Sequence, residues 1–353
     1  MTSLAPVKAA YKKLGTSGFR VSVPILGCMS FGDSKWQPWV LNEEDALPVL
    51  KAAYDMGITS WDTANMYSNG KSEMVIAAAL KKYSIPRSKV QILTKVFTLT
   101  DGEDPDLIGL RYNANDNTEY SNLFGLSRTA IFHQVNGCLR RLETDYIDLL
   151  QIHRFDYATP IEETMCALND LVRSGKVRYI GASSMYAFQF AMMQACAEKN
   201  GWTKFVSMQN HYNLLYREEE REMNKYCDLT GVGLIPWGPL AAGALARAPD
   251  TTTVRSNLLP NLIKVAPTFY DLSEGEAPQE ILKRVREIAE KKGYTRAETG
   301  LAWVMSKVSS PLVGASTVKR LEEAVSAAHK TLEEDEIKYL EEPYVPRPNC
   351  GFA

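Results

Sequence analysis

The sequence lacks the features that mark several large classes of protein. It has no stretch of roughly 18 apolar residues, the length that a membrane-spanning helix needs, and residues 1–8 lack the apolar core of a signal peptide. It also has no basic block, and its net charge of −2 comes from acidic and basic residues mixed along the chain. We therefore expect a cytoplasmic protein that binds neither a membrane nor a nucleic acid.

Clusters of cysteine and histidine are absent as well. The six cysteines are too far apart for a Cys-x-x-Cys motif, so we expect reduced thiols rather than a metal or redox site. Three of the four histidines, His133, His211 and His329, are scattered, and we interpret them as structural or surface residues. The sequence predicts no metal site.

What the chain does have is a regular alternation of short apolar runs with stretches whose apolar residues recur at helical spacing. After a hairpin at residues 11–22, this alternation predicts eight strand–helix units. The expected strands are residues 24–29, 58–62, 90–95, 147–153, 179–182, 205–209, 233–236 and 311–313. The expected helices are residues 43–56, 72–83, 127–142, 161–174, 187–199, 217–229, 279–292, 296–307 and 318–332.

Units of this kind favour a closed (β/α)8 TIM barrel, which takes about 250 residues plus insertions. The rival is an open, doubly wound sheet, but the Gly-x-Gly-x-x-Gly motif that such a sheet carries after its first strand is missing. We predict an α/β fold with a single barrel domain over residues 1–353 and an N-terminal β-hairpin. Residues 97–126 and 240–278 follow the third and seventh strands and are predicted to be long loops at the C-terminal face, where barrels bind ligands.

Three successive predicted strands each end on an ionisable residue. These residues are Asp62, Lys95 and His153, and Tyr67 follows Asp62 by five positions. Because parallel strands finish at the same end of a barrel, we expect the four side chains to lie close together. Four polar groups at one end of three adjacent strands are hard to explain as an accident.

Together these four side chains can deliver a proton. A free phenol has a pKa of roughly 10, and a nearby ammonium lowers it, which is the effect expected of Lys95 on Tyr67. Asp62 can hold Lys95 in place, and His153 can orient a carbonyl oxygen beside Tyr67. Each residue alone also has an ordinary explanation, as a cap, a solvated charge or a packing group. What the group lacks is a source of electrons, and a hydride-donating cofactor is its natural complement.

Residues 61–67, Trp-Asp-Thr-Ala-Asn-Met-Tyr, resemble the Asp-Thr-Ala-x-x-Tyr signature of the aldo-keto reductases. The runs that end on Lys95 and His153 resemble that family's lysine and histidine strands in order and spacing. The resemblance implies a (β/α)8 barrel and the NADPH-dependent reduction of a small-molecule aldehyde or ketone. It also implies that Tyr67 is the general acid, that Lys95 and Asp62 tune it, and that His153 orients the carbonyl.

Residues 152–156 and 181–185 resemble microbial and fungal members of the family, such as the versiconal hemiacetal acetate reductase type. An alternative is an NADP(H)-binding regulatory protein with little turnover, like the channel β-subunits that resemble this family and keep the same four residues. A non-redox barrel enzyme such as an isomerase would not explain Tyr67 and Lys95 together with Trp237. The sequence does not predict the oligomeric state.

The resemblance also implies an NADPH site in the second half of the barrel. Polar strand ends can bind the nicotinamide carboxamide, the indole of Trp237 can stack on the ring, a loop of small residues can approach the pyrophosphate, and the start of the last main helix suits a phosphate. Ser184 and Thr317 stand where relatives often have Asn and Arg, but Arg320 is a fixed cation and favours NADPH over NADH. The implied positions are Met29, Asp62, Ser183, Ser184, Gln209, Trp237, Gly238, Pro239, Leu240, Ala241, Gly243, Gly314, Ser316, Thr317, Arg320 and Glu323.

The substrate pocket is expected to have large apolar walls, which suit an aromatic or medium-length aldehyde or ketone. Arg154 can favour a polar or anionic substituent, or it can pair with Asp156 as part of the structure. The expected substrate contacts are Tyr67, Phe97, His153 and Arg154, and further candidate walls are Trp36, Trp39 and the tail around Phe352.

Overall fold

The protein is described by a computed structural model that covers residues 7–100, 120–247, 257–258 and 272–350. Eight parallel strands form a curled sheet in the order β11-β10-β9-β8-β7-β6-β3-β12. Their bounds are β3 (Ile25–Gly27), β6 (Ser60–Asp62), β7 (Gln91–Val96), β8 (Ile147–Ile152), β9 (Val177–Ser183), β10 (Ser207–Gln209), β11 (Gly233–Leu234) and β12 (Leu312–Gly314).

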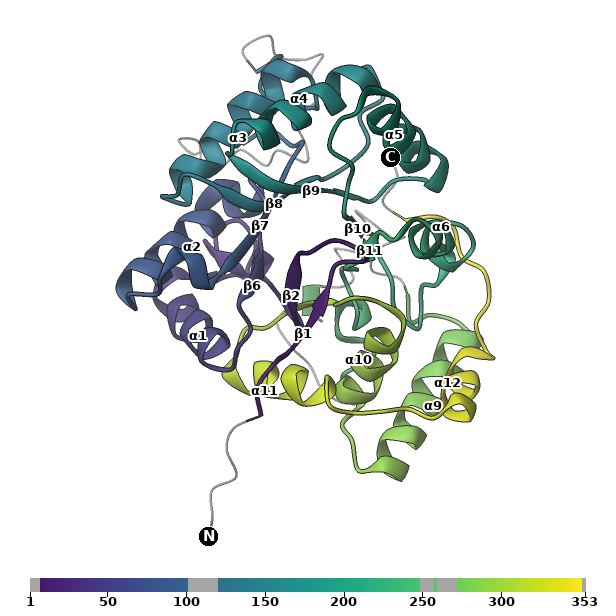
Figure 1. Ribbon diagram of the computed structural model, residues 1–353. Helices are drawn as coiled ribbons and strands as arrows, with labels where there is room; N and C mark the ends of the chain where they lie inside the picture. Colours follow the sequence, from purple (N-terminus) through teal and green to yellow (C-terminus); the bar gives the residue numbers. More distant parts are fainter. Residues whose placement is uncertain (1–6, 101–119, 248–256, 259–271, 351–353) are drawn as a thin grey trace.

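The two edges of this sheet meet and close it into a barrel. The backbone N–H of Leu312, in β12, donates to the carbonyl of Pro236, just after β11 (2.9 Å), and the N–H of Ser309 donates to the carbonyl of Leu234 (3.0 Å). Figure 1 shows the helices surrounding the strands on the outside. The predicted (β/α)8 barrel is confirmed.

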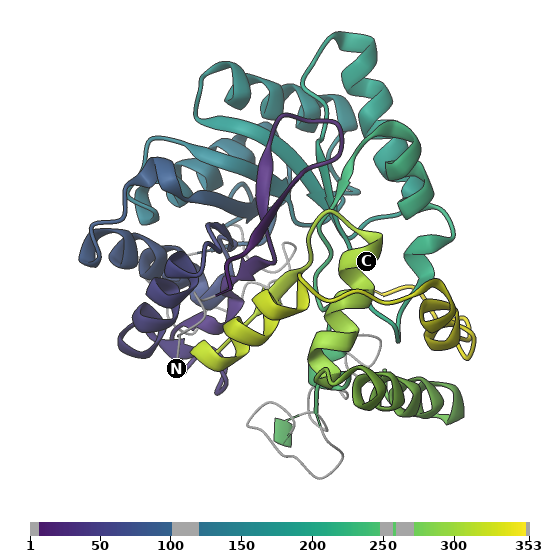
Figure 2. The same ribbon diagram turned by 60° about the horizontal axis from the view of Figure 1, so that its bottom comes forward.

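The predicted N-terminal hairpin is present, and it covers one end of the barrel. β1 (Ala10–Lys13) pairs with β2 (Arg20–Val23), and both views place this hairpin across the ring of strands (Figures 1 and 2). Leu14 and Phe19, from its turn, are buried in a cluster with Leu93 and other barrel residues. Because β2 leads directly into β3, the hairpin lies where the strands begin, and a ligand must enter where the strands finish.

The outer layer consists of helices with one apolar face. Their bounds are α1 (Glu43–Asp55), α2 (Lys71–Lys82), α3 (Arg128–Arg141), α4 (Ile161–Arg173), α5 (Ala187–Asn200), α6 (Met223–Thr230), α9 (Glu276–Lys292), α10 (Arg296–Lys307), α11 (Val318–Ala327) and α12 (Glu334–Glu341). In α4, the buried side chains Met165, Leu168 and Leu171 lie at helical spacing. α10 begins with a capping box, because the Thr295 hydroxyl accepts from the N–H of Glu298 (3.0 Å), whose carboxylate accepts from the N–H of Thr295 (2.8 Å).

Some details of the helices differ from the sequence predictions. The helix expected over residues 217–229 begins only at Met223, because Glu218–Glu220 forms a 3-10 turn whose first two side chains are buried. The helix expected over residues 318–332 ends at Ala327, and the short α12 that follows was not predicted. Its apolar face is too small to recognise in the sequence, since the buried residues of α12 are Glu336 and Leu340.

A short parallel pair outside the barrel, β4 (Phe31–Gly32) with β5 (Leu41–Asn42), was not predicted either. Within the described ranges, no helix is both long and apolar enough to cross a membrane. Large parts of the two predicted long loops, and Phe352, lie outside the described residues.

Candidate active site

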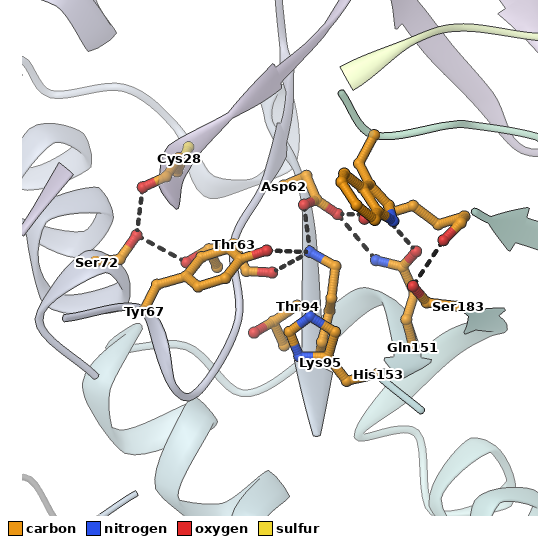
Figure 3. Close-up of polar contacts among 12 residues, drawn as sticks. Cys28, Asp62, Thr63, Tyr67, Ser72, Thr94, Lys95, Gln151, His153 and Ser183 are labelled. Atoms are coloured by element: carbon orange, nitrogen blue, oxygen red, sulfur yellow. Dashed lines mark hydrogen bonds and ion pairs between the residues drawn. The ribbon is translucent and has the colours of Figure 1, made fainter. Parts of the chain in front are cut away.

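The barrel brings the four predicted catalytic side chains together. Asp62 ends β6, Lys95 is the penultimate residue of β7, and His153 directly follows β8. Tyr67 starts a 3-10 turn (Tyr67–Gly70) after β6. All four therefore lie at the end of the barrel opposite the hairpin, and Figure 3 shows the Lys95 amine between the Asp62 carboxylate and the Tyr67 hydroxyl.

Lys95 is the centre of this arrangement. Its side chain is fully buried, and its ammonium donates to Asp62 Oδ1, to the carbonyl oxygen of Thr63 (2.8 Å) and to Tyr67 Oη (3.4 Å). A buried ammonium is costly unless it is paired and hydrogen-bonded, and here all three of its donors have an acceptor. Asp62 thus holds Lys95 as the sequence predicted.

The pKa of Tyr67 does not shift in the direction expected from the sequence. Burial of the phenol raises its pKa, and the Lys95 ammonium lowers it by less, so the net pKa lies above the ordinary value. Burial alone would lower the pKa of Lys95. Asp62 and Tyr67 together raise it by more than burial lowers it, so the net pKa of Lys95 also lies above its ordinary value. The pair therefore consists of a neutral phenol and an ammonium, which is a proton donor ready for use.

His153 stands beside the phenol. The two ring centroids are 6.0 Å apart, with the rings nearly perpendicular. Burial, helped by the positive charges of Arg154 and Lys95, holds the pKa of His153 well below its usual value, so the imidazole is neutral at pH 7. Its buried Nδ1 has no hydrogen-bond partner among the described residues. A neutral ring can donate one N–H to a substrate oxygen.

α2, the helix that follows the turn carrying Tyr67, is joined to α3 by a buried ion pair and to β7 by a hydrogen bond. Arg141 Nε donates to Glu73 Oε2 (2.7 Å), and Glu73 Oε1 accepts from the hydroxyl of Thr94 (2.6 Å), the neighbour of Lys95. Gly70 has a φ of 89°, and a Cβ there would meet the Arg141 side chain at 2.6 Å. These contacts fix where Tyr67 lies relative to Lys95.

Gln151 belongs to the site but was missed by the sequence analysis. Its Nε2 donates to Asp62 Oδ2 (2.9 Å), and so does Nε2 of Gln209 (3.0 Å), which also donates to Gln151 Oε1 (2.8 Å). Because Lys95 donates to Oδ1, both oxygens of the buried Asp62 carboxylate accept hydrogen bonds. The alternation of a strand could have revealed Gln151, because it lies two positions before His153.

The residues proposed for the nicotinamide meet at the ends of β9, β10 and β11. The hydroxyl of Ser183 donates to the carbonyl of Gln209 (2.6 Å), and Trp237 Nε1 donates to Ser184 Oγ (3.3 Å). The half-buried indole of Trp237 stacks on His211 with centroids 4.1 Å apart and 4° between the rings. His211 is structural, as expected, but its position against this wall of the site was not foreseen.

The loop after Trp237 and the start of α11 contain the other predicted cofactor positions. Residues 238–243 form a tight turn in which the N–H groups of Ala241 and Gly243 donate to carbonyls of the same loop, so these two donors are not available to a pyrophosphate. At α11, Thr317 caps the helix, and Arg320 Nη1 donates to Ser316 Oγ (3.1 Å). Among the described residues, the exposed Arg320 forms no ion pair.

The remaining predicted cofactor positions are distributed around the same face. Met29 lies in the turn that follows β3, and Gly314 ends β12 directly beside Gly27. Glu323 accepts a hydrogen bond from the hydroxyl of Thr295 (2.5 Å), which ties α11 to α10. In the described part of the chain, no three His, Cys, Asp or Glu side chains could hold a metal ion.

An aromatic wall adjoins Tyr67. The Trp36 ring lies 6.5 Å from the Tyr67 ring and 6.3 Å from that of Trp39. Phe97 follows β7, and its N–H donates to Gln134 Oε1 (2.8 Å).

Arg154 is half-buried and does not pair with Asp156. Its Nη1 donates to the carbonyl of His153 (2.7 Å). The Asp156 carboxylate instead accepts from the N–H groups of Leu126 (2.7 Å) and Ala158 (2.9 Å) and from the Thr159 hydroxyl. Of the two roles considered for Arg154, the structural pairing is wrong.

These side chains fit a nicotinamide dinucleotide phosphate. Trp237 stacks on His211 on one side and donates to the Ser184 hydroxyl, and within the described ranges Arg320 at a helix N-terminus pairs with no carboxylate. A flat ring with a carboxamide and a phosphate are the groups that such donors recognise.

Comparison with known proteins supports this description. A family model described as the aldo/keto reductase family matches residues 25–344. The chain is 54% identical over 356 residues to an aldo-keto reductase of Metarhizium robertsii (99% of this chain, 95% of the relative) and 50% identical over 338 residues to versiconal hemiacetal acetate reductase of Aspergillus parasiticus (96% and 97%). It is 49% identical over 359 residues to a putative aryl-alcohol dehydrogenase of Schizosaccharomyces pombe (99% of each). Fold, motifs and relatives agree, and the chain belongs to the aldo/keto reductase family of oxidoreductases.

Proposed function

We propose that the protein is an NADPH-dependent carbonyl reductase, built as a single barrel domain over residues 1–353, in which Tyr67 is the general acid. The observation that supports this most directly is the neutral phenol of Tyr67 next to the Lys95 ammonium, with the neutral imidazole of His153 alongside. All six cysteines are free thiols, which is consistent with a cytoplasmic location.

In this mechanism each side chain has one task. His153 donates an N–H to the substrate carbonyl oxygen and orients it beside Tyr67. Tyr67 transfers its proton to that oxygen, and Lys95 stabilises the phenolate that remains. Asp62 keeps Lys95 in place. When bound, NADPH supplies the hydride that these residues lack.

The proposed cofactor contacts follow the geometry of the site. Ser183, Ser184 and Gln209 bind the carboxamide, Trp237 stacks on the nicotinamide, and Arg320 binds the 2′-phosphate together with its neighbours at the start of α11. The loop of residues 238–243 is proposed to contact the pyrophosphate through groups other than the N–H donors of Ala241 and Gly243, and Met29, Gly314 and Glu323 complete the site.

Removing Arg320 tests the preference for NADPH. Arg320→Ala should raise the KM for NADPH by about 10-fold or more and leave the KM for NADH nearly unchanged, since a charge-assisted hydrogen bond contributes roughly 1.5–3 kcal/mol. Arg320→Lys keeps the positive charge, so its KM for NADPH should lie between that of the wild type and that of Arg320→Ala. Initial rates with both cofactors measure the effect, and equal changes for NADPH and NADH would contradict the assignment.

The substrate is proposed to be an aromatic or medium-length aldehyde or ketone. Trp36 and Trp39 offer flat apolar contacts close to Tyr67. The relatives named as aryl-alcohol dehydrogenases and as versiconal hemiacetal acetate reductase favour an aromatic carbonyl compound. Phe97 and Arg154 are proposed as further substrate contacts beside Tyr67 and His153.

A single assay separates this function from the regulatory alternative. The loss of NADPH absorbance is followed with a panel of aromatic and aliphatic aldehydes, and cofactor binding is measured in parallel by fluorescence. A reductase consumes NADPH with at least part of the panel. A protein that binds NADPH tightly but turns over none of these compounds would instead support the NADP(H)-binding regulatory protein.

The dependence of the rate on pH follows from the protonation states of the site. Because burial raises the pKa of Tyr67 above its ordinary value, the phenol stays protonated, and kcat/KM for reduction should be flat from about pH 6.5 to 9 and fall only above about pH 10. Because the pKa of His153 is lowered, its imidazole stays neutral above about pH 6.5, and titration of His153 should not reduce the activity in that range. A profile of kcat/KM against pH that declines near pH 8 would contradict the raised pKa of Tyr67.

A further inference from the structure

A buried polar pair, Asn210 and Glu219, lies next to Ser184 and Trp237, two of the proposed nicotinamide contacts. Both side chains are 4% exposed. Asn210 follows Gln209 at the end of β10, and Glu219 comes from the 3-10 turn Glu218–Glu220 before α6. Asn210 Nδ2 donates to Glu219 Oε2 (2.5 Å), and Glu219 Oε1 has no hydrogen-bond partner among the described residues. A carboxyl buried in this way is costly, so its presence calls for a reason.

Asn210 connects the three strand ends that carry the proposed nicotinamide contacts. Its Oδ1 accepts from the backbone N–H of Ser184 (2.7 Å), and its Nδ2 also approaches the carbonyl of Met185 (3.4 Å), both after β9. Its backbone carbonyl accepts from the N–H of Trp237 (3.0 Å), after β11. The side-chain amide of Asn210 therefore holds the backbone after β9, and its main-chain carbonyl holds the backbone after β11.

The contact with Ser184 fixes an unfavourable backbone conformation. Ser184 has a φ of 49°, in the left-handed region that a non-glycine residue adopts only at a cost. With its backbone held in this way, the Ser184 hydroxyl accepts from Trp237 Nε1 (3.3 Å). The positions of the hydroxyl and of the indole edge thus both depend on Asn210.

Glu219 fixes the orientation of the Asn210 amide. An amide can be turned by 180°, which would exchange its oxygen and its nitrogen. With Glu219 Oε2 as the acceptor, the NH2 group must face Glu219, and the oxygen is left to face the N–H of Ser184. Burial, with a smaller opposing contribution from Asn210, raises the pKa of Glu219 to about 8, which agrees with a carboxyl that lies against an amide and not against a cation.

We propose that Asn210 and Glu219 are positioning residues that hold Ser184 and Trp237 in the arrangement that binds the nicotinamide half of the cofactor. This inference rests on the proposed function. It concerns one half of the cofactor only, because the proposed contacts of the 2′-phosphate lie on a separate element, at the start of α11.

The test compares the whole cofactor with a fragment that lacks nicotinamide. Dissociation constants for NADPH and for adenosine 2′,5′-bisphosphate are measured by calorimetry with the wild type and with Asn210→Ala, Glu219→Met and Glu219→Gln. Asn210→Ala should weaken NADPH binding about 10- to 100-fold, Glu219→Met should weaken it several-fold, and both should leave binding of the fragment within about twofold. Glu219→Gln keeps an acceptor for Asn210 Nδ2 and should behave like the wild type.

Asn169→Ala is the matched control. Asn169 is a buried amide on α4 that accepts from the N–H of Thr203 (3.1 Å), a contact that does not involve the strand ends that form the site. Its removal should change neither dissociation constant by more than about twofold.

The outcomes separate this inference from the proposed function. Equal weakening of NADPH and fragment in Asn210→Ala or Glu219→Met would show a general structural role and overturn the inference, as would unchanged binding of both ligands. If Asn210→Ala fails to fold, Glu219→Met provides the same comparison between the change in the dissociation constant for NADPH and the change for the fragment. A wild type that binds neither ligand would overturn the proposed function, and the inference with it.

Discussion

Tyr67→Phe should lower kcat/KM for carbonyl reduction by about 10²- to 10⁴-fold, the range that a positioned general acid contributes. The substitution removes one hydroxyl, whose hydrogen bond to Lys95 is long (3.4 Å), so little stability is lost with it. The Lys95 ammonium keeps its contacts with Asp62 and the carbonyl of Thr63. The dissociation constant for NADPH should therefore stay within about twofold, because the phenol belongs to the proton-donating side of the site.

Single-turnover kinetics with the variant and with Tyr179→Phe measure this effect. Tyr179 lies in β9, and its ring stacks on Phe19 of the hairpin (4.8 Å between centroids), so it is a tyrosine at the closed end of the same barrel. Tyr179→Phe should keep the wild-type rate. A Tyr67→Phe variant with the full rate would show that another group donates the proton, whereas a loss of NADPH binding in parallel would show that the ring mainly shapes the cofactor site.

The sequence was sufficient to predict that the four proposed catalytic side chains meet, because strand ends obey simple geometry. Asp62, Lys95 and His153 each finish a short apolar run, and parallel neighbouring strands must bring such ends together. The register bears this out, since Asp62 pairs with Leu93 and Lys95 with Gln151. The barrel could be predicted for the same reason, because the alternation of strands and helices is a local pattern.

The residues that were missed depend on contacts that no local pattern encodes. Glu218, Glu219 and Glu220 are three consecutive acidic residues, a run that usually lies on a solvated surface, yet the first two are buried. Glu218 accepts from the hydroxyl of Tyr344, 126 residues further along the chain, and Glu219 accepts from the side chain of Asn210, nine residues before it. Only the folded barrel shows that this acidic turn faces inward.

The direction of the Tyr67 pKa shift could not be predicted for a related reason. The sequence places an ammonium near the phenol, and that charge does lower the pKa, as expected. The opposing effect of burial is larger, and it depends on how tightly the turn after β6 packs against the barrel. In the proposed mechanism, Lys95 therefore serves less to create a phenolate in the resting protein than to stabilise one once the proton has been transferred.

Lys95→Met should affect stability and activity at once. Removal of the ammonium leaves the Asp62 carboxylate buried without its cation, although Gln151 and Gln209 still donate to it. Breaking a buried pair in this way costs about 3–5 kcal/mol of the free energy of unfolding. The phenolate formed from Tyr67 also loses its counter-charge, so kcat should fall by about 10²-fold or more. Urea unfolding and steady-state kinetics measure the two effects.

A double variant separates the two effects. Combining Lys95→Met with Asp62→Asn removes both charges, and Gln151 and Gln209 can still donate to the remaining amide oxygen. Since the cost of Lys95→Met comes mainly from the unpaired carboxylate, most of the lost stability should return. The activity should stay low, because no ammonium faces Tyr67. If activity returned together with stability, Lys95 would serve only to keep the barrel folded, and its proposed role in proton transfer would be wrong.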